Sequence, residues 1–270
     1  MAPPLQSPAG DHDRAPVERE NRDAPRTVLV LGASGGLGSA IAETFLAQGH
    51  RTALTFRRPS SVVDDLVTRW NTMSRSYQLD LGDADACKRV VDTVVSDFGE
   101  LHTLIYAAGP LVPMVHLSKV SPAQFRDQML NDAVAFFNAV QPSLPHLRAA
   151  HGNIVAVTTA ATSRYPVRDG LSAGPKGAVE AVVRSIAAEE GRFGVRANSV
   201  GPGMLTSGMA ERLISSGELD VRSLDVARAN IPLRRFGDAS DIAEAVYFLA
   251  SDRAGFISGQ KLNVDGGYST

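Results

Sequence analysis

One stretch decides how this chain folds, and it reads Thr27-Val28-Leu29-Val30-Leu31-Gly32-Ala33-Ser34-Gly35-Gly36-Leu37-Gly38. Its first five residues are apolar or β-branched and predict a buried strand, while the glycines after them predict a tight turn. In the following run to Gln48, Leu37, Ile41 and Phe45 recur at a spacing of four and predict one face of a helix. Strand, turn and helix therefore follow one another directly.

The turn predicts a phosphate-binding site. Because glycine has no Cβ atom, Gly32, Gly36 and Gly38 let the backbone approach a phosphate, with Ser34 and Leu37 in the same turn. The helix that follows points free N–H groups and its positive dipole end at such an anion. The spacing Gly-x-x-x-Gly-x-Gly differs from the common Gly-x-Gly-x-x-Gly fingerprint of dinucleotide folds. A glycine-rich turn that binds nothing is therefore the alternative interpretation.

The composition is that of an ordinary globular protein. The 270 residues are 44% hydrophobic and 21% charged, which suits one large α/β domain. A net charge of -2 gives no reason to expect nucleic acid or an anionic membrane as a partner, and no long apolar run predicts a membrane span. Since Cys87 is the only cysteine, no intrachain disulfide can form, and we expect a cytoplasmic protein without a metal site.

Residues 1–25 differ from the rest in being rich in proline and charge. They lack the apolar core of a secretory signal peptide and carry too many acids for a typical organelle transit peptide. We expect a disordered tail, with the folded domain at 26–270.

Strands and helices alternate strictly along that domain, without a hairpin signal. This order predicts a doubly wound parallel sheet with helices on both faces. The expected strands after the first are 51–56, 77–79, 103–107, 153–159, 196–200 and 261–264, and the expected long helices include 62–71, 121–140, 173–190 and 240–250. Residues 204–228 are left as an irregular lobe with the apolar residues Met204, Leu205, Met209, Leu213 and Ile214.

Ligands of doubly wound sheets bind beyond the carboxyl ends of the strands. Four segments are expected to meet at that edge: the glycine turn, Ala107-Ala108-Gly109, Thr158-Thr159 and Gly201-Pro202-Gly203. Their convergence favours a nucleotide site over an inert turn.

The choice of nucleotide is expected after the second strand, where Arg57 and Arg58 stand. Guanidinium groups bind a phosphate through two hydrogen bonds, and the nearest acids, Asp64 and Asp65, come about two helical turns later. NADP(H) is favoured for this reason over the alternative that both arginines are merely solvated. After the third strand, Asp80 and Leu81 are expected at the adenine, although Asp80 could instead cap the next helix.

From about Arg26 to its end the chain resembles a short-chain dehydrogenase/reductase. The matching pieces are the glycine turn, Leu101 to Gly109, Asn131, Val195-Arg196-Ala197-Asn198 with Pro202-Gly203, and the closing segments Phe248 to Asp252, Ser258-Gly259-Gln260 and Val264 to Gly267. The resemblance implies a Rossmann-like domain with a seven-stranded sheet, a nicotinamide cofactor and a small-molecule substrate. It also implies a homodimer or homotetramer formed through the long central helices and the last strand.

The resemblance also assigns roles to single residues. Lys176 matches the lysine that holds the nicotinamide ribose and lowers the pKa of a catalytic tyrosine. Asn131 matches the residue that keeps a proton-relay water, Thr159 the hydroxyl that holds the substrate carbonyl, and Thr206 the carboxamide contact. Structural roles are the alternatives: a helix bend at Asn131, a strand end at Thr159 and a solvated lysine at Lys176.

The family motif Tyr-x-x-x-Lys is broken, because the tyrosine position holds Ser172. A one-residue insertion would move that position to Leu171, and the enoyl reductase spacing would move it to Asp169. The nearest tyrosine is Tyr165, on an expected loop. Since a positioned general acid contributes about 10²–10⁴ in rate, ordinary ketone reduction is expected to be weak.

Three hypotheses follow from this break. Tyr165 or Asp169 could supply the proton, or the substrate could be an iminium ion that needs none. In the third, the chemistry is an isomerisation, elimination or cyclisation without redox, or the protein only binds. Asp132, beside Asn131, is expected either to line the cavity or to face solvent. The lobe 204–228 is expected to form a substrate lid.

Overall fold

The structure, a computed structural model, describes residues 25–110, 112–206 and 221–270. The predicted N-terminal tail lies outside these residues except for Pro25. Met209, Leu213 and Ile214 of the predicted lid lie outside them as well.

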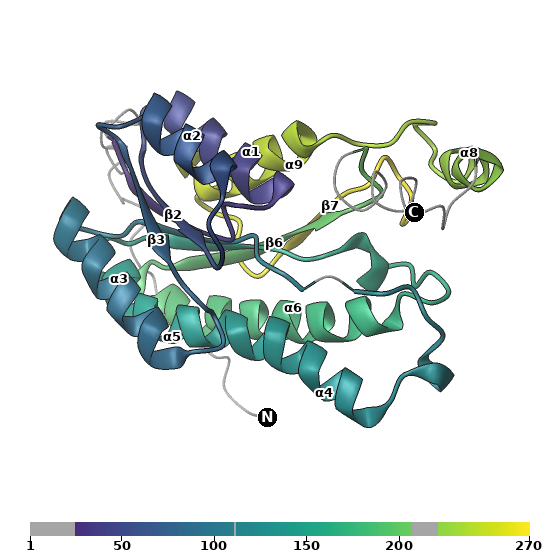
Figure 1. The fold of residues 1–270 in the computed structure, drawn as a ribbon. Helices are drawn as coiled ribbons and strands as arrows, with labels where there is room; N and C mark the ends of the chain where they lie inside the picture. Colours follow the sequence, from purple (N-terminus) through teal and green to yellow (C-terminus); the bar gives the residue numbers. More distant parts are fainter. Residues whose placement is uncertain (1–24, 111, 207–220) are drawn as a thin grey trace, which may run out of the picture.

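One parallel sheet runs through the molecule (Figure 1). In the described residues it has seven strands, in the order β3-β2-β1-β4-β5-β6-β7. This confirms the predicted doubly wound, Rossmann-like architecture. Chain order reverses between β1 and β4, which is where such sheets bind their ligands. The strands are β1 (Thr27–Leu31), β2 (Arg51–Phe56), β3 (Ser74–Gln78), β4 (Thr103–Tyr106), β5 (Asn153–Val157), β6 (Arg196–Pro202) and β7 (Lys261–Val264).

β1 is an interior strand of the sheet and pairs with β2 on one side and β4 on the other. All five of its residues are buried. A parallel strand covered on both faces needs apolar side chains on both sides, which is why Thr27–Leu31 reads as a continuous apolar run and not as an alternating one.

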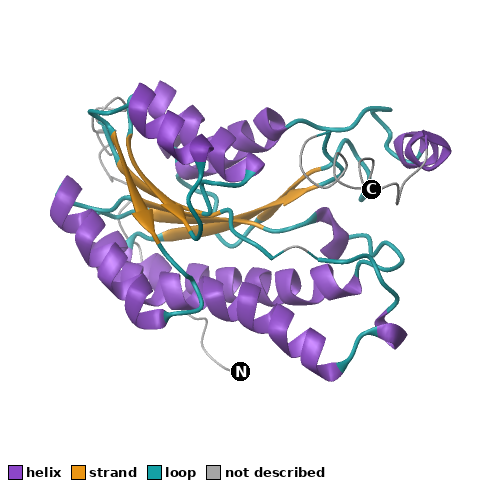
Figure 2. Ribbon diagram, in the orientation of Figure 1, coloured by secondary structure: helices purple, strands orange, loops and turns teal. Residues whose placement is uncertain are grey.

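Helices cover both faces of the sheet (Figure 2). On one face α1, α2 and α9 enclose a core with Ile41, Leu66 and Val246, and on the other α3, α5 and α6 enclose a core with Val94, Phe136 and Val183. The helices are α1 (Gly36–Ala47), α2 (Ser61–Arg69), α3 (Ala84–Phe98), α4 (Pro122–Met129), α5 (Ala135–Ala149), α6 (Gly170–Glu190), α8 (Val221–Ala229) and α9 (Ala239–Ala250). Short helical turns are η1 (Leu117–Lys119), η2 (Leu130–Val134), η3 (Ala160–Thr162), η4 (Gly191–Phe193) and η5 (Asp252–Ala254).

The prediction for β3 was wrong in its bounds: the strand begins at Ser74 and not at Tyr77. β3 is an edge strand that pairs only with β2, and Arg75 and Ser76 are exposed. Polar side chains on an edge strand leave no apolar signal at its start.

The predicted helix 121–140 was also wrong at both its middle and its end. A π-helical turn, η2, interrupts it at Leu130–Val134, and α5 continues through Pro142 and Pro145 to Ala149. A proline inside a helix costs about 3 kcal/mol, but burial of one large apolar side chain contributes about 1.5–3 kcal/mol. Burial of Phe136, Val140 and Leu147 is therefore enough to keep the helix intact.

Two further differences concern the substrate side of the fold. α6 begins at Gly170, earlier than the predicted 173, so Ser172 lies in its first turn. Residues 221–228, which we expected to be irregular, belong to α8.

Candidate active site

The glycine turn between β1 and α1 has two kinds of glycine. Gly32 has a φ of 87°, and a Cβ atom there would lie 2.8 Å from the Cα atom of Ala108. A Cβ atom at Gly38 would lie 2.2 Å from the carbonyl oxygen of Gly32, whereas one at Gly36 would meet no protein atom within 4 Å. Gly32 and Gly38 are therefore required for packing, and Gly36 leaves open space beside the backbone.

Thr55 on β2 holds the turn in place, a role that the sequence alone did not reveal. Its hydroxyl accepts the N–H of Gly32 at 3.0 Å, and its carbonyl oxygen accepts the N–H of Ala33 at 2.9 Å. Within the described residues, the N–H groups of Gly36 and Leu37 have no acceptor, because they belong to the first turn of α1. The open space and the free N–H groups fit a pyrophosphate.

The two arginines after β2 are exposed, and neither forms an ion pair with an acid in the described part of the chain. The carbonyl oxygen of Arg57 accepts a hydrogen bond from Gln78 at 3.2 Å, and Arg58 follows it directly. Their guanidinium groups are thus free to bind a phosphate.

Asp80 and Leu81 lie in the turn after β3. The carboxylate of Asp80 accepts the N–H of Gly82 at 2.9 Å, and the carbonyl oxygen of Leu81 accepts a hydrogen bond from Asn138 at 2.9 Å. The alternative that Asp80 caps the next helix is wrong, because Asp83 caps α3 by accepting the N–H of Ala86. Asp80 stays exposed beside the carboxyl end of the sheet.

Lys176 lies at the carboxyl ends of β4 and β5. Its Nζ atom is 3.0 Å from Oδ1 of Asp132, 3.3 Å from the carbonyl oxygen of Ala108 and 3.4 Å from that of Val157. The side chain of Lys176 is 13% exposed and that of Asp132 is 4% exposed. The alternatives of a solvated Lys176 and a solvent-facing Asp132 are both wrong.

Tyr106, the last residue of β4, completes this cluster. Its hydroxyl lies 3.0 Å from both Oδ1 and the backbone carbonyl oxygen of Asp132. The pKa of Tyr106 is raised well above its ordinary value, first by burial and then by the charge of Asp132. The sequence did not mark Tyr106 as a site residue, because an aromatic residue inside an apolar strand resembles any core residue.

Asn131 and Thr159 both form local hydrogen bonds. Asn131 is exposed in the π-helical turn, and its side chain donates to the carbonyl oxygen of Asp127 at 2.8 Å. The hydroxyl of Thr159 accepts the N–H of Ala161 at 3.1 Å at the start of η3. Each side chain therefore has a structural role. The roles expected from the resemblance, holding a relay water for Asn131 and the substrate carbonyl for Thr159, stay predictions.

Ser172, at the tyrosine position of the motif, and the two candidate proton donors, Asp169 and Tyr165, differ in burial. Ser172 is half-buried on α6, one turn before Lys176. Asp169 precedes the first residue of α6, is half-buried, and has its pKa raised by burial to about 6. Tyr165 is 72% exposed on the loop after η3.

The remaining predicted cofactor residues line the same edge of the sheet. Ala107 donates its N–H to Leu31, and a Cβ atom at Gly109 would lie 3.3 Å from Nζ of Lys176. After Pro202, Gly203 donates its N–H to Val264, and the hydroxyl of Thr206 donates to Asp238 at 2.5 Å. Ser34 is exposed in the glycine turn.

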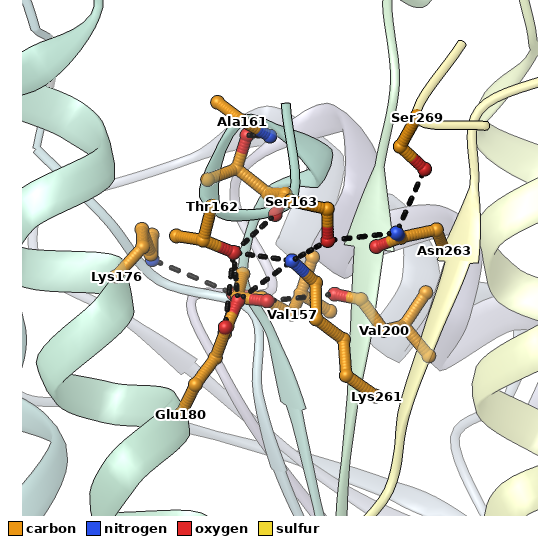
Figure 3. A network of polar contacts seen from close by, with 12 residues as sticks. Val157, Ala161, Thr162, Ser163, Lys176, Glu180, Val200, Lys261, Asn263 and Ser269 are labelled. Carbon is orange, nitrogen blue, oxygen red and sulfur yellow. Dashed lines mark hydrogen bonds and ion pairs between the residues drawn. The ribbon is translucent and has the colours of Figure 1, made fainter. Parts of the chain in front are cut away.

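A second polar network, partly buried, fixes the loop after β5 (Figure 3). The hydroxyl of Thr162 donates to Glu180 on α6 at 2.7 Å, and Nζ of Lys261 on β7 lies 3.1 Å from the same carboxylate and also bonds Thr162. Nδ2 of Asn263 donates to Ser163 at 2.9 Å. The loop that begins at Thr159 is thereby tied to α6 and β7 independently of Lys176.

Two kinds of feature are absent from the described residues. They contain no group of three or more histidine, cysteine, aspartate or glutamate side chains that could hold a metal ion. Nor does this part of the chain include a helix with the length and apolar character needed to cross a membrane.

The chain matches known proteins over most of its length. The family model described as enoyl-(acyl carrier protein) reductase matches residues 32–269. The chain is 31% identical over 247 residues to the 3-oxoacyl-(acyl-carrier-protein) reductase FabG of Staphylococcus aureus, covering 90% of this chain and 97% of that protein. It is 32% identical over 252 residues to versicolorin reductase stcU of Emericella nidulans, covering 90% and 95%.

Solved structures agree with the sequence matches. A short-chain type dehydrogenase/reductase from Mycobacterium ulcerans superposes with a TM-score of 0.83 at 27% identity, covering 90% of both chains. The Cj0485 dehydrogenase superposes with a TM-score of 0.85 at 21% identity, covering 91% of this chain and 94% of that one. Together, the glycine turn, the position of Lys176 and these matches show that the chain belongs to the short-chain dehydrogenase/reductase superfamily, a superfamily of oxidoreductases.

Proposed function

We propose that the protein is an NADP(H)-dependent reductase that reduces a C=O or C=N bond of a small molecule, one belonging to secondary metabolism. One observation carries the proposal: the glycine turn and Lys176 are joined through Ala108. The Cα atom of Ala108 lies against Gly32, and its carbonyl oxygen accepts a hydrogen bond from Lys176. A cofactor bound with its phosphates at the turn would extend along this edge of the sheet toward Lys176.

The residues present fit such a cofactor. Gly36 and Leu37 offer free N–H groups to its phosphates, and Arg57 and Arg58 offer unpaired guanidinium groups to a 2′-phosphate. When bound, NADPH supplies a hydride ion. The chain itself has to orient the acceptor, exclude water and manage the proton.

Asp169 is the group that we propose for managing this proton. Residues 169 and 176 are separated by about two helical turns, so they share one face of α6 about 10 Å apart along its axis. Ser172 lies between them, and a serine hydroxyl is too weak an acid to replace tyrosine. Because the pKa of Asp169 is raised to about 6, part of the population carries a proton near neutral pH.

The ionised form of the same carboxyl supports the C=N alternative. Within the described residues Asp169 forms no ion pair, whereas the charge of Lys176 is balanced by Asp132. An unbalanced carboxylate in a partly desolvated site favours a cationic substrate such as an iminium ion. Reduction of that ion gives a neutral amine and needs no proton donor.

We also propose a homodimer or homotetramer. Phe125, Leu130, Val134 and Phe137 lie along α4, η2 and α5, and each is 40–50% exposed. A row of exposed apolar side chains of this kind supports association through the long central helices, as expected from the family resemblance. Analytical ultracentrifugation of the full chain tests it, and a monomer at micromolar concentration would contradict it.

The function is tested with NADPH or NADH and matched pairs of cyclic imines and cyclic ketones. Loss of the near-ultraviolet absorbance of NADPH, together with reduced product by mass spectrometry, supports the proposal. If the substrate is converted while NADPH is unchanged, the enzyme is an isomerase, dehydratase or cyclase. If neither NADPH binding nor conversion occurs, the protein is a binding subunit of another kind and the proposal fails.

A further inference from the structure

The ammonium group of Lys176 is saturated by the protein itself. An ammonium group has three N–H donors. Three oxygen atoms lie within hydrogen-bonding distance of Nζ, on Asp132, Ala108 and Val157. The side chain is 13% exposed, and the only anion among the three is Asp132.

Asp132 occupies a position where packing alone favours an apolar residue. It precedes Ala135, Phe136 and Ala139, all buried, at the spacing of a core-facing helix stripe. A buried carboxylate is costly unless a charge and hydrogen bonds compensate it. Packing therefore does not explain Asp132. The two groups that compensate its buried charge are the ammonium group of Lys176 and the hydroxyl of Tyr106.

Tyr106 fixes the carboxylate from the other side. Its ring packs edge-to-face on Phe136, with centroids 5.1 Å apart, and its hydroxyl donates to Asp132. The ring also lies under Nζ of Lys176, with the centroid 5.2 Å away. Tyr106, Asp132 and Lys176 thus form one buried cluster with a net charge close to zero.

We propose that Asp132 is a positioning residue that holds Lys176 in place and balances its charge, and that Tyr106 orients Asp132. In the family motif the lysine is paired with a tyrosine, and here that tyrosine is replaced by Ser172. The charge of Lys176 is therefore already engaged when substrate arrives. This inference does not depend on which bond the enzyme reduces.

The first test is a double-mutant cycle of Asp132→Asn and Lys176→Met, measured by urea unfolding of the full chain. Removing one partner leaves the other charge buried and unpaired, so each single variant is expected to raise the unfolding equilibrium constant by a factor on the order of 10²–10³. The double variant leaves no lone charge. Its unfolding equilibrium constant is therefore expected to rise by less than the product of the two increases measured in the single variants. If the increase in the double variant equals the product of the two single increases, Asp132 and Lys176 are not energetically coupled and the proposal is wrong.

A single variant that does not fold still gives an answer. If Asp132→Asn is unfolded and the double variant is folded, a lone buried ammonium group is the cause, and the proposal is supported. If both are unfolded, the carboxylate has a purely structural role and the proposal is wrong. Asp127→Asn, an exposed acid on the same helical segment, is the matched control and is expected to behave as the wild type.

The second test separates positioning from simple packing. Ser172→Tyr places a phenol one helical turn from Lys176, and its ionisation is followed by tyrosinate absorbance against a Ser172→Phe reference. With Asp132 present, the introduced phenol is expected to titrate near its ordinary pKa of about 10. In Ser172→Tyr/Asp132→Asn, the freed charge of Lys176 is expected to lower that pKa by about one unit or more.

The same titration curve in both backgrounds would mean that Asp132 does not control the charge of Lys176. Tyr106 does not disturb the measurement, because its own pKa is raised further above the titration range by burial. Tyr106→Phe in the Ser172→Tyr background is expected to give an intermediate shift, since it frees Asp132 to move without removing its charge.

Discussion

The carboxyl group of Asp169 is expected to set the pH dependence of turnover. Burial raises its pKa from 3.8 to about 6. At pH 7 about one-tenth of the molecules would carry the proton, compared with roughly 0.06% for an ordinary aspartate. Burial therefore increases the amount of available acid on the order of 10²-fold, which is within the range that general acid catalysis contributes.

The direction of the pH dependence identifies the substrate class. If a C=O bond is reduced, the protonated carboxyl is the active form, and kcat/KM falls tenfold per pH unit above about 6. If an iminium ion is reduced, the ionised form is active, and the rate rises through about pH 6 to a plateau. In both cases Asp169→Asn removes this limb and lowers the rate on the order of 10²-fold or more.

Initial rates of NADPH oxidation between pH 5 and 9 provide the assay. Asp169→Asn is not expected to lose stability at neutral pH. A raised pKa means that the folded state holds its proton more tightly, so stability falls as the pH rises from about 3.8 through about 6, and a neutral side chain avoids that loss. If the variant keeps the wild-type rate and the limb near pH 6, and Tyr165→Phe abolishes turnover, the argument for Asp169 is refuted.

The glycine turn, the arginines after β2 and His102 can each be tested by substitution. Gly36→Ala is expected to fold normally yet bind NADPH at least tenfold more weakly. Gly38→Ala is expected to be strongly destabilised, because its Cβ atom would clash with the carbonyl group of Gly32. Equal unfolding midpoints for the two variants would contradict this. Arg57→Ala/Arg58→Ala is expected to weaken NADPH binding by tenfold or more and leave NADH binding unchanged, as measured by fluorescence titration; parallel losses would exclude a 2′-phosphate contact. Burial lowers the pKa of His102, whose Nδ1 atom accepts the N–H of Thr27. The urea midpoint of unfolding is therefore expected to fall as the pH drops below about 6.5, because the unfolded state then binds the proton more readily. In His102→Asn the fall is expected to be smaller.

The fold could be predicted from the sequence because its signals are local. The run Thr27–Leu31 and the glycines after it are contiguous, and the alternation of strands and helices predicts parallel pairing without any knowledge of contacts. Predictions failed where tertiary packing decides the outcome. β3 has few apolar residues because it lies at an edge, and α5 continues through Pro142 and Pro145 because its buried face outweighs their cost.

The residues of the candidate site also differ in whether local sequence or tertiary contacts reveal them. Gly109, which follows β4, and Lys176, which lies on α6 and reaches the same edge of the sheet, could be placed from motif and topology alone. For Asp132 the sequence allowed both a cavity-lining and a solvent-facing position, and it did not mark Tyr106 at all, because both depend on a contact between a π-helical turn and the end of β4. The one signal in the sequence was that Asp132 stands at the spacing of the buried face of a helix. An acid is rarely buried there unless it is paired.

The proposed function depends on hydride transfer from NADPH in a site where Ser172 stands at the tyrosine position of the family motif. Transfer of label from NADPH carrying deuterium at C4 to the product, followed by mass spectrometry, tests it most directly. We predict one deuterium in the product of the cyclic imine or ketone that the enzyme turns over, and a loss of label transfer in Lys176→Met. Product formed without deuterium from either C4-labelled epimer of NADPH would contradict the claim.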